Sequence, residues 1–160
     1  MRLGKEFTHP VGYPDVPQFR LVDMFTSGTH SSVKESITAA FNSPSSNLRV
    51  LIATIAFGMG VNPPDVHYII HCGPPNDIET YVQEVGRGGR DGSLTYAILY
   101  FSPLLKRFVE KDMLDYCTQD QQCRRDKLFY DFDKYAHSDN NMVVNVVMYI
   151  TNTVHVDVVL

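Results

Sequence analysis

Two arginines in a glycine-rich stretch are the residues of this sequence with the clearest chemistry. The stretch reads QEVGRGGRDG over residues 83–92 and places Arg87 and Arg90 about one helical turn apart. Arginine offers a planar, permanently charged fork that matches phosphate oxygens. Glycine removes the side chain where a backbone must approach another group closely. The pattern therefore predicts a surface that contacts a polyphosphate.

A plainer interpretation places the same arginines in solvent at the end of a helix. The helix dipole favours positive charge there. The three glycines at 86, 88 and 89 weigh against this interpretation, because glycine weakens a plain helix end. Residue types alone leave both interpretations open.

A second candidate follows the predicted strand at residues 48–54. Thr54 ends the strand, and Gly58 and Gly60 follow shortly after it. A hydroxyl together with backbone amides freed by glycines can bind a phosphate, and open α/β sheets bind ligands at the carboxyl ends of their strands. The alternative is a tight turn whose Phe57 and Met59 fill the core. Spacing alone favours that alternative.

Composition limits the class of protein. The 160 residues carry a net charge of −4, which argues against a free-standing nucleic-acid binder driven by charge but not against one local basic face. Three cysteines without a CxxC pair fit a reducing compartment. No signal peptide or apolar run of membrane-spanning length is visible, so we expect an intracellular protein with no membrane partner.

Alternating apolar and helical patterns predict an α/β domain with a mainly parallel sheet. Ser31 or Ser32 is expected to cap the first helix, and Asn76 or Asp77 the second. The second, third and fourth strands are apolar enough to be buried on both faces. The predicted strands lie at residues 19–26, 48–54, 66–71 and 95–101, the helices at 32–41, 78–85, 104–116 and 122–132, and a strand-like tail at 142–160.

Several of these segments closely resemble the RecQ DNA helicases. TIAFGMG at 54–60, IETY at 78–81 and QEVGRGGRDG at 83–92 look like motifs V and VI of superfamily 2 helicases in their RecQ form. LVDMFT at 21–26 looks like the preceding stretch of the same lobe. The resemblance covers roughly residues 19–133. It is specific, because two long motifs occur in the right order at a plausible separation.

The resemblance implies a RecA-like fold of the P-loop NTPase type, and only part of a motor. RecQ enzymes hold ATP and Mg²⁺ between two RecA-like lobes, and the first lobe carries the P-loop and the acidic metal motif. This sequence contains neither GxxxxGK[ST] nor DExH. We therefore expect an incomplete second lobe, beginning after that lobe's usual first strand and helix. It would be inactive alone and complemented by a first lobe, for instance from another chain.

The resemblance also implies roles for individual residues. Arg90 would be the arginine finger on the γ-phosphate, Arg87 would couple ATP to DNA, and Gln83 would orient that network. The remaining residues implied in ATP binding or coupling are Gly58, Gly60, Asp65, Gly86 and Gly89. The residues implied in contacts with the DNA backbone are Ser27, Thr29, His30 and Thr54.

The chain departs from the RecQ pattern at informative positions. Gly88 stands where the family usually has Ala, and we expect it to loosen the loop that aims the arginines. Cys123 matches the first zinc ligand of the RecQ zinc-binding subdomain, but the later CxxC is missing. A lone thiolate cannot fill the four positions around zinc. We therefore expect no structural zinc and treat Cys123 as an orphan ligand position.

The predicted organisation has four parts. They are an extended lead-in at 1–18, a helicase C-terminal domain at 19–103, a helical start of a RecQ zinc-binding-like region at 104–135, and an unassigned tail at 136–160. The resemblance implies an ATP-dependent 3′-to-5′ DNA helicase acting in DNA repair and recombination in the nucleus. The alternatives are a non-catalytic DNA-binding module and a decayed helicase fragment.

Overall fold

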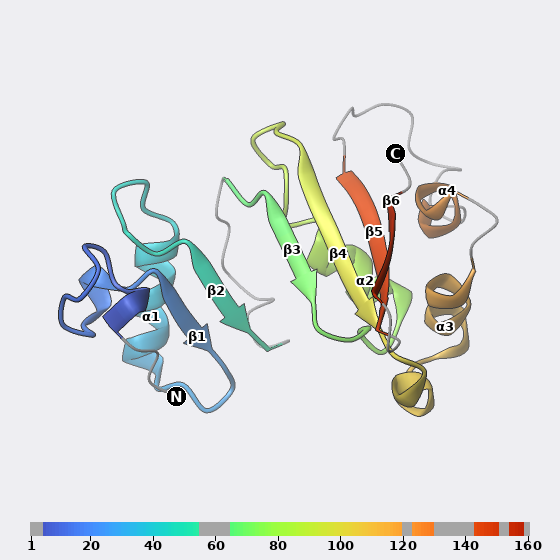
Figure 1. Cartoon of the computed structure of the whole chain (residues 1–160), viewed down its shortest axis with the longest axis horizontal. Coiled ribbons are helices and arrows are strands. Elements are labelled where there is room, and N and C mark those ends of the chain that lie inside the picture. Colours follow the sequence, from blue (N-terminus) through green and yellow to red (C-terminus); the bar gives the residue numbers. More distant parts are fainter. Residues whose placement is uncertain (1–4, 55–64, 120–122, 130–142, 151–153, 159–160) are drawn as a thin grey trace. The chain divides into compact units, whose positions relative to one another are not determined.

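The computed structural model describes residues 5–54, 65–119, 123–129, 143–150 and 154–158. The chain divides into two compact units at Pro63 and Pro64 (Figure 1). This boundary falls inside the segment 19–103 that the sequence pattern predicts as one helicase domain. Among the described residues, no helix is long and apolar enough to cross a membrane.

The first unit is built around a single βαβ motif. Strands β1 and β2 are parallel, with Val22 opposite Val50, and α1 connects them. A small core of Phe25, Ile37 and Leu48 joins the helix to the strands. The elements are β1 (Val22–Phe25), α1 (Ser31–Phe41) and β2 (Val50–Ala53).

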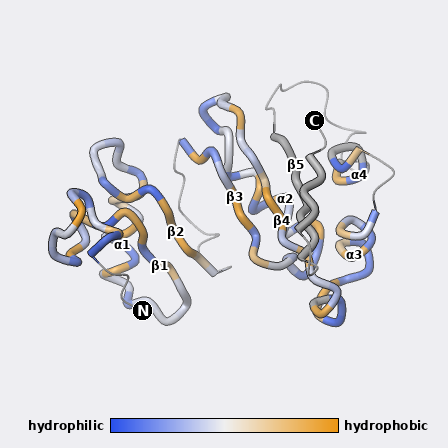
Figure 2. Tube along the Cα trace, in the orientation of Figure 1, coloured by the Kyte–Doolittle hydropathy of each residue, from blue (hydrophilic) through white to orange (hydrophobic). Residues whose placement is uncertain are grey.

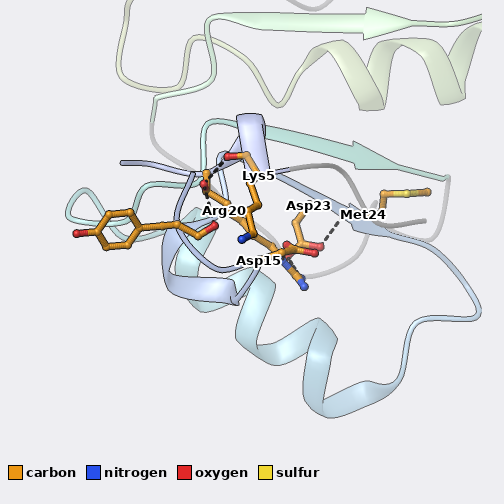
Figure 3. Close-up of polar contacts among 7 residues, drawn as sticks. Lys5, Asp15, Arg20, Asp23 and Met24 are labelled. Carbon is orange, nitrogen blue, oxygen red and sulfur yellow. Dashed lines mark hydrogen bonds and ion pairs between the residues drawn. The ribbon is translucent and has the colours of Figure 1, made fainter. Parts of the chain in front are cut away.

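The segment before β1 is tied to that strand by charge. Arg20 contacts Asp15 through Nε at 2.7 Å and Asp23 through Nη1 at 3.1 Å (Figure 3). Asp23 also accepts a hydrogen bond from the Met24 amide at 2.9 Å. Partial burial lowers the pKa of Arg20, but the hydrogen bonds and charges of the two aspartates outweigh it and raise that pKa overall. The guanidinium therefore stays charged and clamps the lead-in onto β1.

The second unit contains another βαβ motif and two further strands. Strands β3, β4 and β5 run parallel, β6 is antiparallel to β5, and the sheet order is β3-β4-β5-β6. The predicted strand character of the tail is thus confirmed. The elements are β3 (Tyr68–His71), α2 (Ile78–Val85), β4 (Thr95–Phe101), α3 (Lys111–Thr118), α4 (Arg124–Phe129), β5 (Val143–Ile150) and β6 (Val154–Val158).

The core of the second unit lies between β4 and the helices. Alternate residues of β4, from Thr95 to Phe101, are fully or almost fully buried, as expected for a strand with one face against a helical layer. Helix α2 contributes Tyr81 and Val85. The other members of this core are Ala97, Leu99, Met113, Tyr116, Cys117 and Leu128.

The prediction that β2 and β3 are buried on both faces is wrong. Val50 and Ile52 of β2 are 52% and 48% exposed, and Tyr68 and Ile70 of β3 are 64% and 54% exposed. In each unit a helix packs on one face of the strands, and the residues that alternate with that face remain at the surface. The apolar residues along these strands are visible in Figure 2.

The predicted helix over residues 104–116 is also wrong, because it is split. A 3₁₀ turn spans Pro103–Phe108, and α3 begins at Lys111. Between them Val109 is extended, and the Glu110 amide donates to the Asn76 carbonyl at 2.8 Å. A backbone donor used in this tertiary contact cannot serve a continuous helix.

The two predicted helix caps have different outcomes. Asp77 caps α2 as expected, accepting a hydrogen bond from the Thr80 amide at 2.7 Å. Helix α1 begins at Ser31 itself, and its cap is His30, whose Nδ1 accepts from the Ser32 amide at 3.4 Å. The prediction of Ser31 or Ser32 as cap is therefore wrong.

The buried core predicts unequal reactivity of the three cysteines. Cys72 and Cys123 are exposed, whereas Cys117 is buried, and burial raises the pKa of its thiol to about 12. Because the thiolate is the reactive form, only about one Cys117 in 10⁴ is reactive at pH 8. We expect Ellman's reagent at pH 8 to titrate two thiols quickly in the native chain and three in urea. Rapid reaction of all three without denaturant would contradict this core.

Candidate phosphate-contacting site

Helix α2 carries the candidate arginines just beyond its carboxyl end. Its apolar residues Tyr81 and Val85 point into the core, which leaves Gln83 exposed on the opposite side. Gly86 ends the helix, and its amide donates to the Val82 carbonyl at 2.9 Å. The helical period therefore places Gln83 on the solvent face of α2.

The arginines flank a tight turn. The Gly88 amide donates to the Val85 carbonyl at 3.1 Å, and Gly89 has a φ of +66°, a conformation that glycine adopts without steric cost. Arg87 is half-buried before the turn, and Arg90 is exposed after it. Arg90 Nε lies 3.4 Å from the Gly86 carbonyl oxygen. The structure thus brings Gly86, Arg87, Gly89 and Arg90 together, with Gln83 one helical turn before Arg87.

Gly88 is enclosed rather than loose, which overturns the expectation from the sequence. A Cβ built at this position would lie 2.3 Å from Thr95 Cγ2 and 3.1 Å from Ile69 Cδ1. Neither distance leaves room for a methyl group. The missing side chain therefore allows the turn to sit directly on β3 and β4.

The same turn is fixed to the start of the sheet by two hydrogen bonds. The Gly89 amide donates to the Val66 carbonyl at 3.2 Å, and Thr95 Oγ1 donates to that carbonyl at 2.9 Å. Both carbonyl lone pairs can be used in this way. Val66 follows Asp65 directly, so Asp65 is the neighbour of the residue that anchors the arginine turn. Asp65 itself is exposed.

A hydrogen bond between His71 and Glu84 holds the last turn of α2 against β3. His71 Nε2 and Glu84 Oε2 are 2.8 Å apart, and their side chains are 10% and 26% exposed. Glu84 lies between Gln83 and Val85, so the contact fixes the helical turn from which the arginines emerge. The His71 ring also lies 5.1 Å from the Tyr81 ring, centroid to centroid.

Beyond Arg90, a short polar contact closes the loop before β4. Ser93 Oγ donates to Asp91 Oδ1 at 2.5 Å and lies 3.2 Å from His67 Nδ1. The hydrogen bonds from the Ser93 hydroxyl and amide lower the pKa of Asp91. Asp91 therefore remains a carboxylate and supports the loop as a hydrogen-bond acceptor.

The candidate DNA-contacting turn lies in the first unit, between β1 and α1. The Thr29 amide donates to the Thr26 carbonyl at 3.1 Å, and the Thr26 amide donates to Thr29 Oγ1 at 3.0 Å. Thr29 is thus engaged in the turn itself, whereas Ser27 and His30 are exposed. Lys34, which the sequence pattern does not single out, adds a positive charge to this turn. Its Nζ lies 3.3 Å from the Ser27 carbonyl oxygen.

The remaining predicted residues are placed only in part. Thr54 directly follows β2, is exposed, and its amide donates to the Phe25 carbonyl at 3.1 Å. Gly58 and Gly60 lie outside the described residues. Cys123 is exposed, and no cluster of three or more His, Cys, Asp or Glu side chains suited to a metal occurs in the described part of the chain.

The supporting residues of the arginine turn escape sequence reasoning. Thr95 is a single polar residue at the start of an apolar strand, and His71 is a single histidine at the end of another. Neither forms a local pattern with the arginines, because their contacts join residues 6 to 29 positions apart. Glu84, the acidic residue inside QEVGRGGR, is the one signal in the sequence that points to a partner such as His71.

The His71–Glu84 hydrogen bond yields a stability prediction. Glu84→Ala removes this hydrogen bond and should lower the free energy of unfolding by about 1 kcal/mol, because Glu84 is partly in water. Glu79→Ala is the matched control, since it removes the same charge from an exposed position of the same helix. Urea denaturation measures both. Equal effects of the two substitutions would show that the pair contributes nothing.

Comparisons with known proteins agree with the motifs. The model of the helicase conserved C-terminal domain matches residues 19–92. ATP-dependent DNA helicase Q-like 2 of Arabidopsis thaliana is 33% identical over 136 residues, which are 77% of this chain and 19% of that protein. ATP-dependent DNA helicase RecQ of Pasteurella multocida is 37% identical over 91 residues, 57% of this chain and 14% of that protein.

A human relative gives the same result. ATP-dependent DNA helicase Q4 of Homo sapiens is 38% identical over 100 residues, 59% of this chain and 8% of that protein. The chain spans less than a fifth of the length of each of these relatives. This chain therefore contains the conserved C-terminal domain of helicases, and it is related to the DNA helicases of the RecQ family.

Proposed function

We propose that this chain acts as the second RecA-like lobe of a RecQ-type, ATP-dependent 3′-to-5′ DNA helicase. In this role it supplies Arg90 and Arg87 to a nucleotide that a first lobe holds, and it contacts the DNA backbone through the turn at residues 27–30. We place its action in DNA repair and recombination in the nucleus, as the resemblance implies.

The observation that carries the proposal is the arginine turn. Arg90 is exposed, and the two residues before it are held by hydrogen bonds from the Gly88 and Gly89 amides to the Val85 and Val66 carbonyls. A guanidinium presented from a fixed backbone suits the charge that spreads over the γ-phosphate oxygens in the transition state. Arg87, half-buried at the base of the turn, would link that contact to the body of the lobe.

The described residues fit part of an ATP site. Exposed Arg90 and Gln83 offer donors to phosphate oxygens. ATP bound there would supply the phosphoryl group whose hydrolysis drives unwinding. The part of the chain that the structure describes offers no cluster of carboxylates for Mg²⁺. We therefore assign the metal, and most of the nucleotide, to the first lobe.

The DNA contact rests on the turn between β1 and α1. The exposed Ser27 and His30 carry hydrogen-bonding groups, and the Lys34 ammonium lies beside the Ser27 carbonyl. Such groups contact phosphates without reading bases, which suits a motor that moves along any sequence. The same features fit a second candidate function, a DNA-binding module without catalysis. The two functions differ in whether Arg90 affects ATP turnover.

ATP hydrolysis tests the assignment of Arg90. We expect the purified chain alone to show no DNA-stimulated turnover. A fusion that places the first lobe of the Pasteurella multocida relative ahead of this chain should hydrolyse ATP when single-stranded DNA is added. Arg90→Ala should lower that rate about 10³-fold, the effect typical of losing an arginine finger.

Arg107→Ala is the matched control for this assay, because it removes an exposed arginine from the 3₁₀ turn before α3. Full activity of the Arg90→Ala fusion would contradict the catalytic role and favour the binding module. DNA-stimulated turnover by the isolated chain, lost on Arg90→Ala, would contradict the need for a first lobe.

Salt dependence tests the DNA-contacting turn. Each phosphate contact contributes about one unit to the slope of log K against log salt concentration. Lys34→Ala should therefore reduce this slope by about one for single-stranded DNA, measured by fluorescence anisotropy. Lys111→Ala, at the exposed start of α3, removes the same charge and should leave the slope unchanged. Equal slopes for the wild type and Lys34→Ala would exclude Lys34 from the interface.

A further inference from the structure

We propose that Thr95 is a positioning residue for the arginine turn, and that Gly88 and Thr95 form a matched pair in which the threonine methyl fills the space of the missing side chain. The inference rests on the proposed function, because that function gives the arginines their role. The inference goes beyond that function because it assigns Thr95, a buried residue of β4, to the site.

The Thr95 methyl group occupies the space that a side chain at position 88 would need. A Cβ at position 88 would approach Thr95 Cγ2 to 2.3 Å, well inside van der Waals contact. Thr95 is fully buried, and the same Cβ would lie 3.1 Å from Ile69 Cδ1 and 3.2 Å from Thr95 Cβ, so the space beside Gly88 is closed on more than one side. Glycine at 88 and threonine at 95 therefore fit together, whereas alanine at 88 requires a smaller residue at 95.

The Thr95 hydroxyl group binds the same carbonyl that anchors Gly89. Thr95 Oγ1 donates to the Val66 carbonyl at 2.9 Å, and the Gly89 amide donates to the same oxygen at 3.2 Å. A Cβ at Gly89 would also lie only 3.1 Å from Thr95 Oγ1. One side chain thus lies against both glycines between Arg87 and Arg90 and shares the anchor of Gly89 on the segment before β3.

This arrangement assigns separate tasks to the two ends of Thr95. The methyl sets how closely the turn approaches the sheet, and the hydroxyl orders the carbonyl that holds Gly89. A change in either end moves the backbone from which both arginines extend. Small displacements of a catalytic group are costly, because its donors must match the positions of the transition-state oxygens.

A mutant cycle on the full chain tests the pairing. Gly88→Ala should lower Tm by roughly 5–10 °C through overpacking. Adding Thr95→Ser, which removes the methyl and keeps the hydroxyl, should restore most of that loss. Thr95→Ser alone should lower Tm by a few degrees, since it leaves a gap beside Gly88. Thr118→Ser makes the same chemical change at an exposed position of α3 and serves as the control.

A spectroscopic signature separates positioning from plain stability. We expect the side-chain Nε–Hε NMR signals of Arg87 and Arg90 to shift in Gly88→Ala and to return towards their wild-type positions in Gly88→Ala/Thr95→Ser. Thr95→Val keeps the bulk of the side chain and removes the hydroxyl. It should shift the Gly89 amide signal and leave the Gly88 contact in place.

The outcomes are distinct. Equal loss of Tm in Gly88→Ala and in the double variant would overturn the pairing. Arginine signals that stay unchanged in Gly88→Ala, Thr95→Ser and Thr95→Val would overturn the positioning role. If Gly88→Ala does not fold, recovery of folding in the double variant supports the pairing, and failure of both opposes it. ATP turnover by the fusion with the first lobe tests the proposed function separately. If Arg90→Ala leaves that turnover unchanged while the cycle still shows rescue, the phosphate role fails and the pairing stands.

Discussion

The packing of α2 on β4 is the contact on which the second unit depends. Tyr81 and Val85 are the inward residues of the helix, and Ala97 and Leu99 are the inward residues of the strand. All four are at most 4% exposed, so the helix cannot rotate or slide without opening the core. Because the arginine turn leaves the end of this helix and re-enters the start of this strand, both ends of the turn are fixed by one apolar contact.

Polar contacts then refine what the apolar contact fixes. His71 and Glu84 join β3 to the last helical turn at 2.8 Å, and Thr95 joins β4 to the segment before β3. Each is a single hydrogen bond of modest net strength, and neither would hold the helix in place alone. These contacts affect the direction of the arginine turn, because they lie at the two points where it begins and ends.

Sequence patterns predicted the helix before the arginines better than they predicted the residues that support the turn. The period of apolar residues in 78–85 placed α2 and its cap Asp77 correctly, and the arginines lie together at its end. Burial of β2 and β3 was misjudged, because an apolar run does not reveal whether a second helical layer covers it. The role of Gly88 was misjudged for a similar reason. In a sequence, a glycine indicates either a flexible loop or a backbone that packs closely on its neighbours, and only the position of Thr95 decides between the two.

The backbone before Arg90 makes shorter hydrogen bonds than the Arg90 side chain does. The Gly88 and Gly89 amides make hydrogen bonds of 3.1 and 3.2 Å, whereas Arg90 Nε reaches the Gly86 carbonyl oxygen at 3.4 Å, at the long end of the range. That carbonyl lies at the negative end of the α2 dipole, which favours a cation beside it. Exchanging this long contact for a phosphate oxygen costs little, while the turn keeps its shape. In the proposed function, a side chain that can exchange this contact on a fixed backbone suits a nucleotide held by another lobe.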